Sequence, residues 1–289
     1  MSKCWPRQPM PRIPASSKIS SSMRREMYEL RIAAWLHDCG KLSTPDYILE
    51  KGTKLESFFD RIELIGTRLE VLLRDIEIAA LKGEISEDEA KAKQQQIRDQ
   101  WMFLQQLNLG REKVPEEEID ELHRIATHQW QPQLEPSDKR SFFTKDELEN
   151  LSVRRGTLTD ANRKIIQDHI LHSIDMLEKM PFPKQLRRIP EYAGAHHERM
   201  DGKGYPNGLT GDQMSIPARI MAVADVFEAL TSHDRPYKKP KTLKESRAIM
   251  EKMRDGGGID PDIFELLWNE SDVVKRYAEK HLLESQRKD

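Results

Sequence analysis

The sequence contains little cysteine and no long hydrophobic run. Its 289 residues include only Cys4 and Cys39, which provide no disulfide framework and fit a reducing compartment. No apolar run approaches the roughly 20 residues that a membrane-spanning helix needs, and the N-terminus lacks the apolar region of a signal peptide. We therefore expect a cytoplasmic location and no membrane contact for this chain.

The sequence also lacks an excess of charge of either sign. The formal net charge is −2 and the pI is near 6.5, so no basic field is available for polymeric nucleic acid. The charged fraction of 33% is high and the hydrophobic fraction of 37% is low. This composition indicates a helical protein with much solvated surface or with an elongated appendage. Any anionic ligand must then be bound by a local cluster of groups.

No segment alternates apolar and polar residues as a strand does, so we expect an all-α fold. Residues 1–22 are rich in Pro and Ser and are expected to form an irregular tail. One helix is expected to start at Thr159 as its N-cap, with Ile165, Ile166, Ile170, Ile174 and Leu177 on its buried side. Further helices are expected at 23–36, 55–81, 87–107, 116–127, 185–202 and 217–232, with a last helical region at 243–283.

Residues 55–107 predict two long amphipathic helices joined by a short turn. Gly83 suits a helix C-terminus, and Ser86 with Glu89 three residues later predicts a capping box for the second helix. The pattern indicates an antiparallel helical hairpin that stands off the body. We expect residues 53–133 to form this arm as an insertion within a domain spanning 23–289.

Several His and Asp residues lie on helices of apolar character, where a polar group without a partner is costly. Imidazole and carboxylate together suit iron, manganese, cobalt, nickel or zinc, and the lack of a cysteine cluster argues against a structural zinc site. The set is too large for one tetrahedral ion and suits two ions sharing a carboxylate. The candidate ligands are His37, Asp38, His169, His196, His197 and Asp225. We interpret His172, three residues after His169, as a surface residue.

These residues lie in or follow segments that resemble the HD-GYP family, a subset of the HD-domain metal-dependent phosphohydrolases. The segments are "LHDCGK" (36–41), "GTLT" (156–159), which leads to His169, "HHERMDGKGYP" (196–206) and "ADVFEALTSHDRPYK" (224–238). The resemblance implies an HD-domain helical bundle into which the long hairpin is inserted. It implies that Asp38 bridges two ions, the other ligands being His37 and Asp225 for one ion and His169, His196 and His197 for the second.

The resemblance also implies residues that contact the substrate. Lys41, Arg235 and Lys238 are expected near its phosphates, and Tyr205 near the pocket wall, with Asp38 and Lys41 as the catalytic residues. Arg and Lys are suited to phosphate oxygens. The family's ions imply two divalent transition metals here, with iron or manganese favoured and zinc, nickel and cobalt compatible.

The family's substrate is a cyclic dinucleotide, usually cyclic di-GMP and in some members 3′,3′-cyclic GMP-AMP. The implied reaction is attack of a metal-bridging hydroxide on the phosphodiester, giving linear pGpG and then GMP if the intermediate is rebound. Two alternatives are a phosphohydrolase acting on another nucleotide and a catalytically weak or inactive cyclic di-GMP receptor. The full ligand set favours the enzyme, because a receptor has no need of it.

The sequence departs from the family pattern in one respect. Many members carry a further His, often with a Glu, well upstream of the HD motif, where a third metal binds. No histidine precedes His37 here, and Glu26 and Glu29 do not match that element. Either the chain is a fragment that lacks the upstream helices and a sensor, which the irregular tail favours, or it is a two-metal variant. We expect no third metal. The hairpin, residues 55–108, is a candidate surface for homodimer formation or for a link to that sensor.

Overall fold

The computed structural model describes residues 21–130, 140–232, 240–269 and 272–287. This part of the chain is all-α, as predicted, apart from one antiparallel pair of two-residue strands, β1 (Gln129–Trp130) and β2 (Arg140–Ser141). A two-residue strand is too short to show alternation in the sequence. The first helix begins at Ser21, within the predicted tail, and residues 1–20 lie outside the described part.

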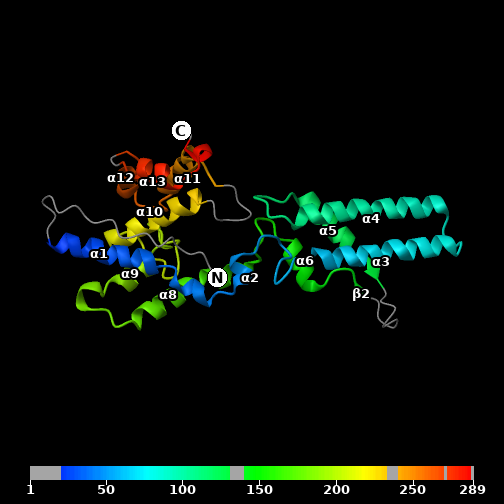
Figure 1. The fold of residues 1–289 in the computed structure, drawn as a ribbon, viewed down its shortest axis with the longest axis horizontal. Helices are drawn as coiled ribbons and strands as arrows, with labels where there is room; N and C mark the ends of the chain where they lie inside the picture. Colours follow the sequence, from blue (N-terminus) through cyan, green and yellow to red (C-terminus); the bar gives the residue numbers. More distant parts are fainter. Residues whose placement is uncertain (1–20, 131–139, 233–239, 270–271, 288–289) are drawn as a thin grey trace.

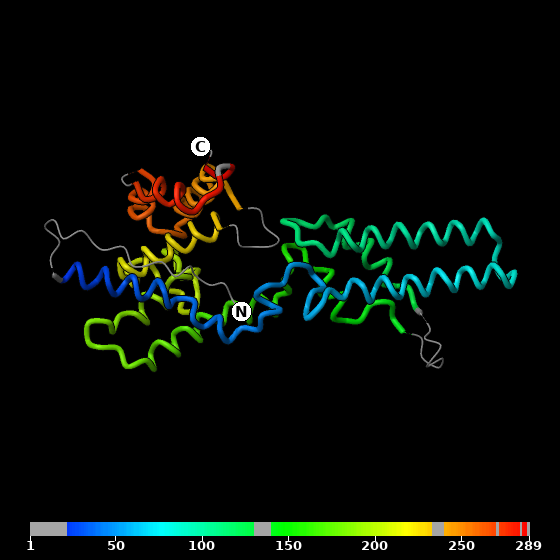
Figure 2. The backbone as a smooth tube through the Cα atoms, in the orientation of Figure 1, coloured from blue at the N-terminus to red at the C-terminus, as the bar shows by residue number. Residues whose placement is uncertain are grey.

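The helices form a body and an arm (Figure 1). The body contains α1 (Ser21–Leu36), η1 (Cys39–Ser43), α2 (Asp46–Leu49), α7 (Asp160–Gln167), α8 (His169–Glu178), η2 (Lys184–Leu186), α9 (Ile189–Gly194), α10 (Ile216–Thr231), α11 (Leu243–Asp255), α12 (Pro261–Trp268), α13 (Val273–His281) and η3 (Glu284–Gln286). The tube in Figure 2 shows α1, α8, α9 and α10 gathered together, with α11 to α13 above α10. The four gathered helices carry the candidate ligands.

The arm contains α3 (Ile62–Leu81), α4 (Glu87–Asn108), α5 (Glu116–Ala126) and α6 (Lys145–Leu151). Helices α3 and α4 run antiparallel, side by side, away from the body, as the hairpin prediction requires (Figure 1). Gly83 adopts φ +72°, a left-handed conformation that favours glycine after a helix. Ser86 accepts the backbone N–H of Glu89 at 3.2 Å and so caps α4.

The arm has its own hydrophobic core. Its buried members include Leu55 and Ile65, Leu104 and Leu107 on α4, three residues of α5, and the later residues Phe142 and Leu151. Because the last two follow residue 133, the packing unit continues beyond the predicted insertion. The boundaries 53 and 133 stay a prediction.

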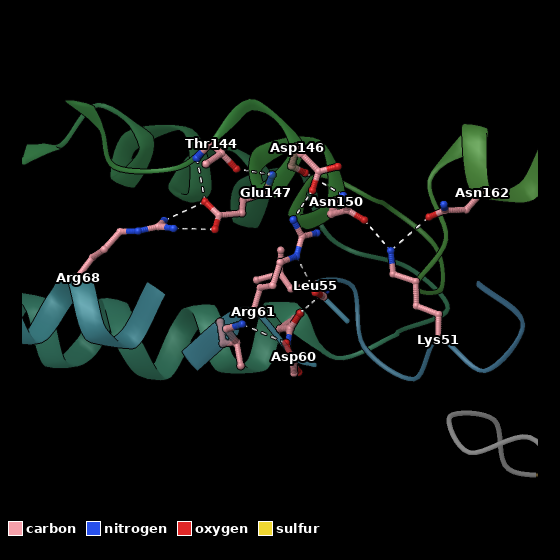
Figure 3. Close-up of polar contacts among 12 residues, drawn as sticks. Lys51, Leu55, Asp60, Arg61, Arg68, Thr144, Asp146, Glu147, Asn150 and Asn162 are labelled. Carbon is pink, nitrogen blue, oxygen red and sulfur yellow. Dashed lines mark hydrogen bonds and ion pairs between the residues drawn. The ribbon is translucent and has the colours of Figure 1, made fainter. Parts of the chain in front are cut away.

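The arm joins the body through buried polar contacts at its base (Figure 3). The Lys51 ammonium donates to the Asn150 side-chain oxygen on α6 at 2.6 Å and to that of Asn162 on α7 at 3.2 Å. The fully buried Lys54 donates to the Leu151 carbonyl at 3.0 Å, and burial lowers the pKa of this lysine to about 8. Lys51 thus links α6 of the arm to α7, the helix that precedes His169.

The predicted helix after Thr159 is two helices. Thr159 caps α7 as expected, accepting the N–H of Asn162, but α7 ends at Gln167 and α8 starts at His169. The Ile166 carbonyl accepts a hydrogen bond from the His169 imidazole. A continuous helix would offer that carbonyl to the N–H of Ile170. Ile165 on α7 is exposed, so the prediction that it faces the core was wrong, and Ile166 is half-buried. Ile170 and Leu177 on α8 are buried, as predicted.

The buried core beneath the candidate ligands is small. It consists of Ala33 on α1, Leu177 on α8, Ile189, Tyr192 and Ala193 on α9, and Met221 on α10. A second cluster joins α10 to α11, α12 and α13. Among the described residues, no helix combines the length and apolar character needed to cross a membrane.

A buried ion pair joins α3 to α6 within the arm. Arg68 on α3 forms two parallel hydrogen bonds of 2.8 Å with Glu147 on α6, whose side chain is 3% exposed (Figure 3). Arg68→Ala should reduce the free energy of unfolding by about 3–5 kcal/mol, because it leaves a buried carboxylate without its cation. Urea denaturation followed by circular dichroism measures this loss.

Lys145→Ala is the matched control. Lys145 lies on α6, the helix that contains Glu147, is exposed, and has no side-chain ion pair among the described residues. We expect a change within about 0.5 kcal/mol. Equal losses for the two variants would contradict the assigned role of the Arg68–Glu147 pair.

Candidate metal centre

The structure brings all six predicted ligand residues to one place. His37 and Asp38 follow the end of α1, and His169 begins α8. The other three are His196 and His197, which follow α9, and Asp225 on α10. The residues therefore come from four helices that pack together in the body. Their role as ligands stays a prediction, whereas their convergence is a property of the fold.

Asp38 lies between the imidazoles. Its Oδ1 is 3.2 Å from His169 Nε2 and 4.0 Å from His196 Nε2, and its Oδ2 is 3.4 Å from His37 Nε2. Asp225 completes the opposite side, with Oδ1 3.8 Å from His37 Nε2 and Oδ2 3.8 Å from His197 Nδ1. A carboxylate in this central position can reach ions on both sides.

Three of the imidazoles are oriented by the same backbone contact. His37 Nδ1 pairs with the Ala34 carbonyl at 2.8 Å, His196 Nδ1 with the Ala193 carbonyl at 2.6 Å, and His169 Nδ1 with the Ile166 carbonyl. A carbonyl only accepts, so each Nδ1 carries the hydrogen. Each Nε2 then presents its lone pair to the centre, as a metal-ligating histidine does.

Burial sets the protonation state of the centre. It lowers the pKa of His196 to about 2 and that of His197 to about 4, so both imidazoles are neutral near pH 7. Burial also raises the pKa of Asp225. It opposes ionisation of Asp38, but the neighbouring imidazoles of His169 and His37 outweigh it, and the pKa of Asp38 lies well below its usual range.

The buried atoms at the centre test whether a metal fits. Asp38 Oδ1, His169 Nε2 and His196 Nε2 are buried and have no hydrogen-bond partner in the described part of the chain. His169 and His196 are only 1% and 2% exposed. Unpaired buried acceptors are costly, and neutral imidazole and carboxylate are ligands for borderline transition metals. The donor set therefore fits divalent metal ions.

The potential ligand atoms form two groups of three residues, and within each group these atoms lie within 4.8 Å of one another. One consists of His169, His196 and His197, and the other of His37, His196 and Asp225. The first matches one of the predicted sets. The second contains the predicted pair His37 and Asp225 and adds His196, which lies in both groups.

The segment 198–209 folds over His197 and brings Tyr205 to the centre. The Tyr205 ring stacks on the His197 ring with centroids 4.8 Å apart and planes at 26°. A Cβ at Gly204 would lie 2.5 Å from the Glu198 Cα, so only glycine allows this close approach. Burial raises the pKa of Tyr205 to about 12, with Asp225 acting in the same direction, and the phenol keeps its proton.

Glu198 holds this segment and was given no role by the sequence analysis. Its side chain is buried, and its two oxygens accept the backbone N–H groups of Asn207 at 2.7 Å and Leu209 at 2.9 Å. The residue follows the two histidines directly in "HHE". A buried carboxylate directly beside candidate ligands is the signal that could have identified the role of Glu198.

Lys41 lies at the edge of the centre. Its ammonium is 2.6 Å from Asp38 Oδ2, and its side chain is 40% exposed. It is therefore close enough to contact a ligand's phosphate. Arg235 and Lys238, the other predicted phosphate contacts, lie outside the described residues.

His172 and Glu29 lie outside the candidate ligand set. His172 is exposed, in agreement with its interpretation as a surface residue. Glu29 on α1 is buried and accepts the backbone N–H of Arg188 at 2.6 Å, at the start of α9. Glu29 thus has a structural partner of its own. The described residues contain no third group of potential metal ligands beyond the two given above.

Comparison with known proteins matches residues 143–263 to the HD domain family. His37, Asp38 and Lys41 precede this segment, and the fold brings them to it across the arm. Two relatives in Vibrio cholerae, 3′3′-cGAMP-specific phosphodiesterases 3 and 1, are 39% identical over 112 residues and 36% identical over 137 residues. A cyclic di-GMP phosphodiesterase of Thermotoga maritima is 36% identical over 117 residues.

These matches cover 39%, 47% and 40% of this chain and 23%, 30% and 31% of the respective relatives. The chain thus matches less than a third of the length of each. The matched segment contains His169, the paired histidines and Asp225, and it retains the Asp-Gly-Lys-Gly-Tyr-Pro sequence that follows them. Residues 143–263 are therefore similar to the HD domain family, and the motif that they retain resembles that of the HD-GYP type.

Proposed function

We propose that this protein is a metal-dependent phosphodiesterase that hydrolyses a cyclic dinucleotide. The observation that carries the proposal is the set of three buried, unpaired acceptor atoms, on Asp38, His169 and His196, that face one centre. The curated relatives named as cyclic dinucleotide phosphodiesterases support the substrate class. Cyclic di-GMP is the substrate we favour. The names of the two Vibrio relatives make 3′,3′-cyclic GMP-AMP the second candidate.

We assign two divalent ions to the centre, iron or manganese by preference. His37 and Asp225 would hold one, His169, His196 and His197 the other, and Asp38 both. Bound there, such ions polarise phosphoryl oxygens and lower the pKa of a coordinated water, which are the two contributions that phosphodiester hydrolysis needs. Neutral imidazoles suit this role, because burial keeps His196 and His197 unprotonated near pH 7.

The chain's own polar groups would bind and orient the substrate. The Lys41 ammonium, beside Asp38, would attract a phosphate oxygen and offset charge that builds up on it. Tyr205, protonated and stacked on His197, would donate a hydrogen bond from the pocket wall. Arg235 and Lys238 follow α10 in the sequence and are proposed as further phosphate contacts on the strength of the family resemblance.

Asp38→Ala should reduce hydrolysis of cyclic di-GMP by at least about a thousandfold, as loss of a principal electrostatic group does. The physical reason is that Asp38 is the carboxylate within reach of both sides of the centre. Product chromatography of metal-loaded protein with each dinucleotide measures the loss, and circular dichroism checks that the helices are retained.

Asp175→Ala is the control, because Asp175 is an exposed carboxylate on α8 whose ion pair, within the described part of the chain, is with Lys179 alone. It should leave the rate unchanged. Near-normal hydrolysis by Asp38→Ala would refute the mechanism. Wild-type protein that loads with metal and binds intact dinucleotide without linear product would favour the receptor alternative.

Metal removal should destabilise the fold. A ligand present at a hundredfold of its Kd stabilises the native state by about 2.7 kcal/mol, so a chelator should lower the Tm clearly. His169→Ala should reduce this chelator effect, whereas His172→Ala, on the same helix but exposed, should retain it. Calorimetry with and without chelator measures the shift. An unchanged Tm in the wild type would argue against a metal centre.

We also propose that the arm forms a homodimer. A groove of about 500 Å³ lies between α3 and α4, with an apolar floor that includes Leu69, Ile97 and Trp101. Its rim carries charges of both signs, on Glu63, Glu70, Arg74 and Arg98. In the described part of the chain these four side chains have no ion pair. A second copy placed antiparallel would set the acidic groups of each groove against the basic groups of the other.

The double variant Arg74→Glu with Arg98→Glu should therefore be a monomer, because it turns attraction across the two-fold axis into repulsion. Light scattering measures the mass. Mixing it with Glu63→Arg, Glu70→Arg protein should restore a dimer, and Lys91→Glu, on α4 outside the groove, should leave the wild-type dimer intact. A wild-type monomer, or an unchanged mass in the double variant, would contradict the proposal.

A further inference from the structure

Ser173 lies on α8, one helical turn after His169, and is fully buried. Its hydroxyl donates to the His37 carbonyl at 2.7 Å and accepts the Gly40 N–H at 2.9 Å. One side chain therefore satisfies two backbone groups of the turn that contains Asp38. The residue belongs to no predicted ligand or substrate set.

The turn and the helix are in backbone contact at this point. A Cβ at Gly40 would lie 2.0 Å from the His169 carbonyl oxygen and 2.5 Å from the Ser173 amide nitrogen. Only glycine permits such an approach, and no other side chain can enter between the two segments. The Ser173 hydroxyl thus supplies the polar link between the turn and α8.

This link lies directly behind the centre. Asp38 is held between His37 and Gly40, the two residues whose backbone groups Ser173 binds, and its Oδ1 is 3.2 Å from His169 Nε2. His169 is the first residue of α8. A shift of the turn along α8 would separate the Asp38 carboxylate from the His169 imidazole.

We propose that Ser173 is a positioning residue of the metal centre: its hydroxyl fixes the Asp38 turn on α8 so that Asp38 and His169 can bind the same ion. The inference rests on the proposed function, because it assumes that the two residues share an ion. Without the hydroxyl, the Gly40 N–H and the His37 carbonyl lose a buried partner. Outer groups that orient metal ligands typically change metal affinity by about 10–100-fold when they are removed.

Ser173→Ala should weaken Mn²⁺ binding to at least one site about tenfold or more. Competition with a chromophoric chelator, under anaerobic conditions, measures the Kd, and calorimetry of the metal-free protein measures its Tm separately. Ser43→Ala is the matched control, since the Ser43 hydroxyl also binds the backbone of Gly40, at 2.6 Å, but on the exposed side of the turn. Its Kd should stay within about twofold of wild type, because the link to α8 is intact.

A second background separates positioning from general destabilisation. In His169→Ala protein, Ser173→Ala should produce little further change in Mn²⁺ affinity, because the contact that it positions has already been lost. Additive losses in that background would overturn the proposal. A lower Tm of the metal-free Ser173→Ala protein together with an unchanged Kd would also overturn it and leave Ser173 a purely structural role.

Ser173→Cys keeps the size of the side chain nearly constant and retains a weak donor and acceptor. This variant replaces Ser173→Ala in the experiment if the alanine variant does not fold. Its Mn²⁺ affinity should lie between the affinity of the wild type and that of a variant lacking the link. Wild-type affinity in Ser173→Cys would contradict the proposal. Wild-type protein that binds no Mn²⁺ would overturn the proposed function as well, whereas normal wild-type binding with an unaffected variant would overturn the positioning role alone.

Discussion

The centre depends on burying three lone pairs that no group of the described chain satisfies. Asp38 Oδ1, His169 Nε2 and His196 Nε2 face one another, and each unpaired buried acceptor costs about 1–3 kcal/mol. The fold could relieve this cost by rotating the imidazoles, but backbone carbonyls hold the Nδ1 atoms of His169 and His196. The orientation is therefore fixed by the helix ends. The surrounding packing must offset the cost of this arrangement, and a bound cation would reduce that cost.

The sequence contained enough information to predict the helical class and to select residues that the fold brings together. The candidate ligands stand in short motifs on apolar helices, and Thr159 has the local signature of an N-cap that the structure confirms. The residues that hold the candidate ligands in place could not be predicted from such local motifs. Gly40 and Ser173 lie 133 residues apart, and neither residue type indicates a metal centre. The break before His169 also lacks a local signal, because it follows from a side chain that takes a backbone acceptor.

The match to the HD domain family starts at residue 143 and does not include the turn that contains Asp38. The HD turn ends at Ser43, and the arm's own core separates it in the sequence from α8. Because the arm packs around a cluster distinct from the one beneath the centre, it can be long without disturbing the ligands. Its connection to α7 through Lys51 is polar and buried, which fixes the base of the arm next to the helix that precedes His169.

The charge of the centre fits an anionic substrate only when ions are present. When all the imidazoles are neutral, as metal ligation requires, the two carboxylates of Asp38 and Asp225 and the Lys41 ammonium give a net charge of −1. Two divalent ions would change this charge to +3, and a cyclic dinucleotide carries one negative charge on each of its two phosphodiesters. The positive net charge remains because the histidine ligands are neutral. Carboxylates in place of the four histidines would cancel it. With two ions bound, a histidine-rich centre would therefore keep a positive charge that attracts phosphate.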